Sequence, residues 1–208
     1  GSPNSLSLSL GAHEISALTI GGEGANVSLS LGNLSDLKIP GNTAHADISF
    51  SGAVSAVSVS GGSNILGIRH IELVSASTSN AASADIGSVG ALTVPGSGNW
   101  LNFNCAGMVS TEVSGRYNTL VKAGTGGIDA FKLTGSENAF TLSSGSTLAL
   151  AEISGQKNRV TVNGTARSVA VTGSRTTLDG SGTVSELTLS AFGCDVTVPA
   201  GNITNTAG

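Results

Sequence analysis

The sequence predicts an all-β protein, a single right-handed parallel β-helix of about ten coils of 18–20 residues each. Three observations lead to this prediction. A glycine-centred pattern repeats along the chain, apolar residues before each glycine alternate with polar ones, and no stretch has the i, i+3, i+4 spacing of a helix. Because one such unit is too short to bury its own apolar face, we expect successive units to stack in register.

The repeat reads Φ-x-x-Φ-x-Φ-x-G-x-x-N-x-Φ, where Φ is an apolar residue, and residues 132–142 and 152–162 show it well. We call its glycine position the anchor. Successive anchors are 19, 20, 14, 21, 19, 20, 20, 18 and 18 residues apart, and this uneven spacing favours a right-handed β-helix over the left-handed hexapeptide type. The anchors are Gly22, Gly41, Gly61, Ser75, Gly96, Gly115, Gly135, Gly155, Gly173 and Ala191.

The repeat extends over residues 6–208, which we therefore expect to form one domain, whereas residues 1–5 resemble a cloning scar and tail. A first, partial coil is expected where Leu6, Leu8 and Leu10 alternate with serine. The short interval before Ser75 and the long one after it predict a loop excursion near residues 76–86. Neither end shows an obvious cap, and exposed terminal strands favour end-to-end self-association.

Asparagine recurs three residues after the anchor. Glycine tolerates positive φ freely and asparagine does so more readily than most residues, so both suit a sharp bend between strands. In stacked coils the amide side chains would lie above one another and form a structural ladder of hydrogen bonds. The residues of this predicted ladder are Asn64, Asn99, Asn118, Asn138 and Asn158.

Composition excludes several classes of partner. Only 11% of the 208 residues are charged, and the formal net charge is −4. Without a cluster of lysine and arginine the chain has no electrostatic footprint for nucleic acid. No apolar run approaches the roughly 18 residues that a membrane span needs. We therefore expect neither nucleic-acid binding nor a membrane span.

The cysteine and histidine positions predict neither a disulfide, nor a metal site, nor a cofactor. Cys105 and Cys194 lie five anchors apart, about 24 Å along the axis, which is far beyond the reach of a disulfide. Two free, mostly buried thiols are expected. His13, His45 and His70 have different offsets from their anchors and cannot form one column.

The carboxylates are too sparse to predict a catalytic residue. Glu112, Lys132 and Glu152 share one column, three residues before the anchor, and predict a ladder of alternating charge on an exposed strand face. Asp129 is the one further carboxylate near Lys132. Sugar-cleaving enzymes need two or three converging carboxylates, so we expect no enzymatic activity.

Outward-pointing aromatic residues are the best candidates for binding a ligand. Trp100 follows Asn99 and Tyr117 precedes Asn118, so both rings should lie exposed on adjacent coils near one corner. With Asn102 and Arg116 they would form an aromatic patch on an otherwise uniform polar surface. We predict that Trp100, Asn102, Arg116 and Tyr117 contact the ligand.

The repeats resemble those of bacterial cell-surface β-helix (β-solenoid) proteins of the adhesin and surface-layer-associated type. The similarity lies in G-x-x-N-x-V-x-V units, as in residues 154–164, and in residues 169–173. The resemblance implies an extracellular, cell-surface location and adhesion to a polysaccharide or another surface. The cellulose-binding tāpirins share this general design. Pectate-lyase-like enzymes share it too, but their catalytic Asp and Arg clusters have no counterpart here.

The function that we expect is that of a non-catalytic extracellular surface module. It would mediate adhesion by binding a polysaccharide, such as a plant cell-wall glycan like cellulose, or another surface. One alternative is a polysaccharide-active lyase or hydrolase, which predicts carboxylates converging in a groove. A second is a self-assembling scaffold or spacer joined by its ends. The separated carboxylates favour the non-catalytic surface module over both alternatives.

Overall fold

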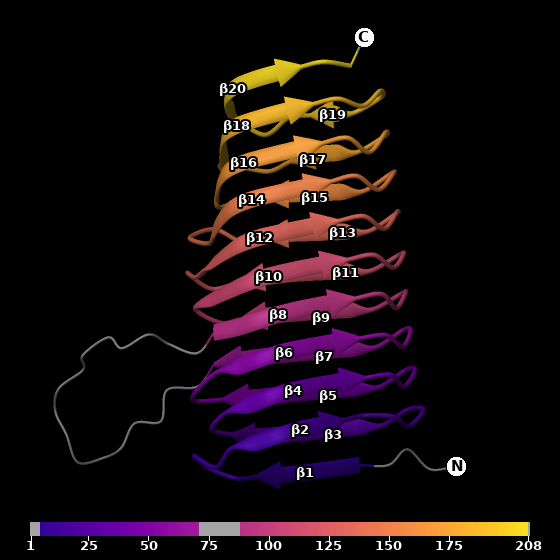
Figure 1. Ribbon diagram of the computed structural model, residues 1–208, viewed down its shortest axis with the longest axis vertical. Coiled ribbons are helices and arrows are strands. Elements are labelled where there is room, and N and C mark those ends of the chain that lie inside the picture. The colour runs from indigo at the N-terminus through magenta and orange to yellow at the C-terminus, as the bar shows by residue number, and fades with distance from the viewer. Residues whose placement is uncertain (1–4, 71–87, 208) are drawn as a thin grey trace, which may run out of the picture.

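Two parallel β-sheets face each other along the length of the coil stack, as Figure 1 shows for a computed structural model that describes residues 5–70 and 88–207. Each sheet has ten strands, and within these residues there is no helix. Odd-numbered strands form one sheet, called sheet A, and even-numbered strands form the other, sheet B. One strand from each sheet makes one coil. The predicted all-β fold, with parallel coils stacked about ten high, is confirmed.

The strands are short, and their bounds repeat from coil to coil. Sheet A contains β1 (Ser5–Ser9), β3 (Asn26–Leu31), β5 (His45–Phe50), β7 (Ile65–His70), β9 (Trp100–Asn104), β11 (Thr119–Ala123), β13 (Ala139–Leu142), β15 (Arg159–Val162), β17 (Thr177–Asp179) and β19 (Asp195–Val196). Sheet B contains β2 (Ile15–Thr19), β4 (Leu34–Ile39), β6 (Val54–Val59), β8 (Ser88–Val94), β10 (Gly107–Val113), β12 (Gly127–Leu133), β14 (Thr147–Ile153), β16 (Thr165–Val171), β18 (Thr183–Leu189) and β20 (Ala200–Asn205).

The hydrophobic core lies between the two sheets and follows the repeat. In sheet A the buried side chains alternate with outward ones, as Phe140 and Leu142 do in β13. In sheet B two outward residues separate the first buried residue from the second, as between Ile128 and Phe131 in β12. This is the Φ-x-x-Φ-x-Φ part of the repeat. Phe131 and Phe140 stack across the core with ring centroids 4.2 Å apart, a contact worth about 0.5–1.5 kcal/mol beyond burial.

The anchor glycines are required by close packing between coils rather than by a positive φ. A Cβ on Gly135 would lie 1.9 Å from the carbonyl oxygen of Gly115, the anchor of the previous coil. The residue that does adopt positive φ stands two positions after the anchor, as Tyr117 does at 58° and Glu137 at 60°. The anchor glycine lies in the bend as expected, but the expectation that it or the asparagine supplies the positive φ there is wrong.

The predicted coil that ends at Ser75 does not exist between the anchors Gly61 and Gly96. Strand β6 pairs directly with β8, and the Gly96 amide donates to the Val59 carbonyl over 3.1 Å. Ile68, at the first apolar position that the repeat gives a coil anchored at Ser75, lies instead in β7 of sheet A. Ser75 itself and the predicted excursion at 76–86 lie outside the described residues. The nine remaining anchors each end one coil, beginning with the coil of β1 and β2, and the coil of β19 and β20 brings the number to ten.

Candidate functional site

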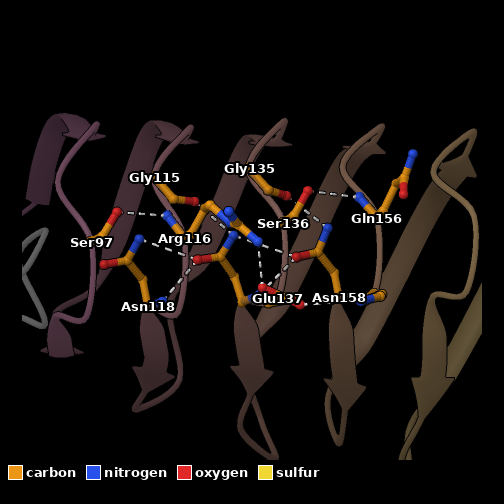
Figure 2. Close-up of polar contacts among 11 residues, drawn as sticks. Ser97, Gly115, Arg116, Asn118, Gly135, Ser136, Glu137, Gln156 and Asn158 are labelled. Atoms are coloured by element: carbon orange, nitrogen blue, oxygen red, sulfur yellow. Dashed lines mark hydrogen bonds and ion pairs between the residues drawn. The ribbon is translucent and has the colours of Figure 1, made fainter.

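The asparagine column forms a continuous ladder along one corner of the coil stack (Figure 2). The Asn118 amide N–H donates to Asn138 Oδ1 over 2.8 Å, and Asn138 Nδ2 donates to the Gly115 carbonyl over 2.9 Å. Equivalent backbone-to-Oδ1 bonds join Asn64 to Asn99 and Asn99 to Asn118. All five asparagines are buried. Since these amides satisfy backbone groups of neighbouring coils, they stabilise the stack and are not exposed to a ligand.

A cluster of charged side chains surrounds Tyr117 at the same corner; we call Arg116, Tyr117, Glu137 and Lys157 the corner cluster. Arg116 Nη2 lies 2.7 Å from Glu137 Oε2, and Lys157 Nζ lies 3.3 Å from Glu137 Oε1. The Arg116 guanidinium lies over the Tyr117 ring, 5.2 Å from its centroid. Figure 2 shows Glu137 beneath Arg116 at the turn.

Glu137 is the electrostatic centre of the corner cluster. Hydrogen bonds from Tyr117 and Arg116 lower its pKa to about 2. The bond to the carboxylate also raises the pKa of Tyr117, because the phenol loses a hydrogen bond when it ionises. Glu137 therefore stays ionised and keeps the two cations in place throughout the physiological range.

A hollow on the outer face of sheet A lies beside Trp100. Trp100 pairs in register with Ile65, and each side chain is 44% exposed. The next outward-facing pair, two residues further along the same strands, is Gly67 with Asn102. The hollow forms where Gly67 carries no side chain, and we call it the sheet A hollow. Its lining residues are Asp47, Gly67, Ile68, Asn102 and Asn104.

Polar side chains line the sheet A hollow. A Cβ on Gly67 would lie 2.7 Å from Asp47 Oδ1, so the carboxylate reaches over the glycine. Asn102 Oδ1 is buried and has no hydrogen-bond partner. Unpaired acceptors of this kind are rare in folded proteins, and because this oxygen is buried it is not itself exposed to a ligand. The hollow thus offers a carboxylate acceptor and amide side chains, one outward column away from the exposed indole ring.

The four predicted ligand-contacting residues fall into two environments. Trp100 and Asn102 lie in β9 on the face of sheet A, whereas Arg116 and Tyr117 lie in the turn before β11. The two environments adjoin, because Trp100 pairs with Thr119, two residues after Tyr117. Sequence reasoning missed Asp47, Ile65, Gly67 and Glu137. The non-existent coil at Ser75 separated the first three from Trp100, and the correct strand register would have found them.

The predicted charge ladder has the expected register on sheet B. Glu112 pairs with Lys132, and Lys132 pairs with Glu152, all with exposed side chains. In the described part of the chain, however, no ion pair joins these three side chains. Within residues 5–70 and 88–207 there is also no group of three His, Cys, Asp or Glu side chains that could hold a metal ion.

The cysteines and one lysine define the remaining reactive groups. Cys105 and Cys194 are free thiols, as predicted, the first buried and the second half-buried. Lys122, which the sequence reasoning did not consider, occupies an inward position of β11 between Phe103 and Leu142. The sequence does indicate this buried lysine, because Lys122 interrupts a column that is apolar on the two neighbouring coils.

Comparison with protein-family models, curated proteins and solved structures found no match. Among the described residues no helix is long and apolar enough to cross a membrane.

Proposed function

We propose that this chain is a non-catalytic extracellular module that binds a polysaccharide through the outer face of sheet A. The observation that carries the proposal is the exposed indole of Trp100 beside the sheet A hollow. The flat apolar face of a sugar ring can stack on an indole while its hydroxyl groups donate to nearby oxygens. The Asp47 carboxylate, which reaches over Gly67, is such an acceptor, and Asn102 and Asn104 line the same hollow.

The shape of sheet A suits an extended polymer. Its strands run across the long axis of the stack (Figure 1), and neighbouring strands are spaced about 4.8 Å apart. Side chains in one column, such as Ile65, Trp100 and Thr119, therefore form a line parallel to that axis. A polysaccharide lying along the stack would meet the same kind of position on successive coils.

The sheet A hollow lacks the groups that glycoside cleavage uses. Most glycosidases place two carboxylates on opposite sides of the scissile bond. Among the described residues Asp47 is the one carboxylate that lines this hollow. This supports binding without cleavage. The cell-surface location and the bacterial origin rest on the resemblance of the repeats and remain part of the proposal.

The test is a pull-down of the purified protein on insoluble cellulose, xylan and chitin, with an assay for released sugar. We expect Trp100→Ala to lose binding to the polysaccharide that retains the wild-type protein. Phe192→Ala is the control, because Phe192 is another exposed aromatic residue, in the turn after β18 and away from the sheet A hollow. Equal binding by wild type and Trp100→Ala would overturn the assignment of the face, and sugar release would overturn the non-catalytic assignment.

A further inference from the structure

A second hollow adjoins Trp100 at the corner cluster, and we call it the corner hollow. Its floor is made by Thr119 and Ala139, which continue the column that begins at Trp100. Three consecutive coils contribute to its lining: Tyr117, Asn118 and Thr119, then Glu137, Asn138 and Ala139, then Lys157 and Arg159. An aromatic ring thus stands at one end of a small-residue floor and two cations stand at the other.

The corner hollow presents positive charge to solvent although the chain as a whole is acidic. The Arg116 and Lys157 side chains are 58% and 51% exposed, whereas Glu137, which pairs with both, is 22% exposed. The same holds for Arg159 at 67% and its partner Asp179 at 18%. Because the carboxylates lie beneath their cations, an approaching ligand meets the cations first.

The cations retain hydrogen-bond donors for a second anion. Lys157 Nζ has one partner, Glu137 Oε1, and a lysine ammonium carries three protons. Arg159 uses Nε and Nη2 for Asp179 Oδ2, at 2.9 Å and 2.7 Å, which leaves Nη1. Asp179 is itself held by Thr161, whose Oγ1 donates to Oδ1 over 2.6 Å. Arg159 is therefore fixed in place before a ligand arrives.

We propose that the corner hollow binds carboxylate groups of an acidic polysaccharide, a polyuronate, and so selects acidic over neutral glycans. This inference rests on the proposed function and names its ligand class. A uronate would place its carboxylate against Lys157 and Arg159 and a neighbouring sugar ring against Tyr117. A polymer that carries a carboxylate on each ring can set one against the two cations, which stand together at the end of the small uncharged floor away from Tyr117. Nucleic acid would require a longer basic stripe.

The experiment compares polygalacturonate with the same polymer after full methyl esterification, which removes the charge and keeps the backbone. We expect the wild-type protein to bind the acidic polymer at least about tenfold more tightly, with a preference that falls as salt is added. The double variant Lys157→Gln/Arg159→Gln should lose this preference and leave binding to the ester unchanged. Lys132→Gln on sheet B removes an exposed lysine elsewhere and should leave the preference intact.

Two further measurements distinguish a loss of the binding site from a loss of folding. A thermal melt followed by circular dichroism shows whether the double variant is folded, and Lys157→Arg, which keeps the charge, should retain the preference. Equal binding of the two polymers by the wild-type protein would overturn the inference while leaving the proposed function intact. Acid-selective binding that survives Trp100→Ala would overturn the role of the sheet A face instead. Equally tight binding of double-stranded DNA would show an unselective anion surface and overturn the polyuronate assignment.

Discussion

Lys122 donates from Nζ to the carbonyl oxygen of Cys105 over 2.8 Å, from a side chain that is completely buried between the two sheets. A second bond, of 2.7 Å, joins Nζ to the carbonyl of Ala123. The ammonium thereby satisfies backbone carbonyls of two neighbouring coils where the chain passes from sheet A to sheet B. Burial lowers the pKa of Lys122 and raises the pKa of the Cys105 thiol.

Replacement of Lys122 by methionine should change how stability depends on pH. The unfolded chain, with the ordinary lysine pKa of 10.5, binds more protons than the folded chain between the lowered pKa and that value. The free energy of unfolding of the wild-type protein should therefore rise with pH in this window, relative to Lys122→Met. Urea denaturation at several pH values between about 7 and 10 measures the difference.

The Cys105 thiol has an opposite effect. Because its pKa is raised in the folded protein, the free energy of unfolding falls as pH rises above the pKa of the thiol in the unfolded chain. Both proteins should therefore also be measured with Cys105→Ala, which removes the thiol. A flat difference between Lys122 and methionine in that background would contradict the assignment of a lowered lysine pKa.

Adding a single methyl group to an anchor glycine should greatly lower the stability of the protein. Gly135→Ala would place its Cβ 1.9 Å from the Gly115 carbonyl oxygen, so the coils must separate. We expect a cost of more than about 3 kcal/mol in the free energy of unfolding. Gly21→Ala is the control, because a Cβ there meets nothing within 4 Å. Similar urea midpoints for the two variants would show that the contact is relaxed at little cost.

This contrast explains how much of the fold could be predicted. The strict recurrence of the anchor and of Phe131, Leu133 and their equivalents predicted stacked parallel coils. It did not reveal why glycine recurs, because the cause is a contact with the previous coil and not a local backbone preference. The sheet A hollow was missed for a related reason: Gly67 is an ordinary residue in sequence and becomes a gap once its register with Asp47 and Asn102 is known.

Alanine substitutions in the asparagine ladder should destabilise the protein more where the side-chain Nδ2 has a partner, as in Asn138, than where it has none, as in Asn64. Asn138→Ala removes the acceptor of the Asn118 amide and the donor to the Gly115 carbonyl, so we expect a cost of about 2–4 kcal/mol. Asn64→Ala should cost about 1 kcal/mol less, because Asn64 Nδ2 has no partner to lose. Denaturant titration of both variants tests the order, and the reverse order would contradict the ladder as described.

Removal of the Glu137 carboxylate should change how the stability of the protein depends on pH in the acidic range. Its pKa falls from 4.5 to about 2 in the folded protein, so its contribution is complete above pH 4.5 and is lost as pH falls through about 2. Glu137→Gln should lower the melting temperature at pH 7, and the difference from wild type should vanish near pH 2. Calorimetric melts across this range give the comparison, and a difference that persists unchanged at pH 2 would refute it.

Filling the sheet A hollow should weaken polysaccharide binding without unfolding the protein. In Gly67→Ala the new methyl group meets the end of the Asp47 side chain, which can rotate away, so stability should change by less than about 1 kcal/mol. Displacement of the carboxylate should lower affinity by about tenfold. Ser185→Ala, on the outer face of sheet B, is a matched control. Unchanged affinity in Gly67→Ala would place the glycan elsewhere.

The coil-by-coil pairing also has a mechanical consequence. Backbone hydrogen bonds between strands run along the long axis of the stack, so a tensile load on the two ends passes through every coil interface in series. Under a rising load the coil interface with the fewest paired residues separates first. In sheet A this is the interface of β17 with β19, which pair through two residues, whereas β5 and β7 pair through six. Under force, the C-terminal coil should detach first, while the middle of the rod still carries the load.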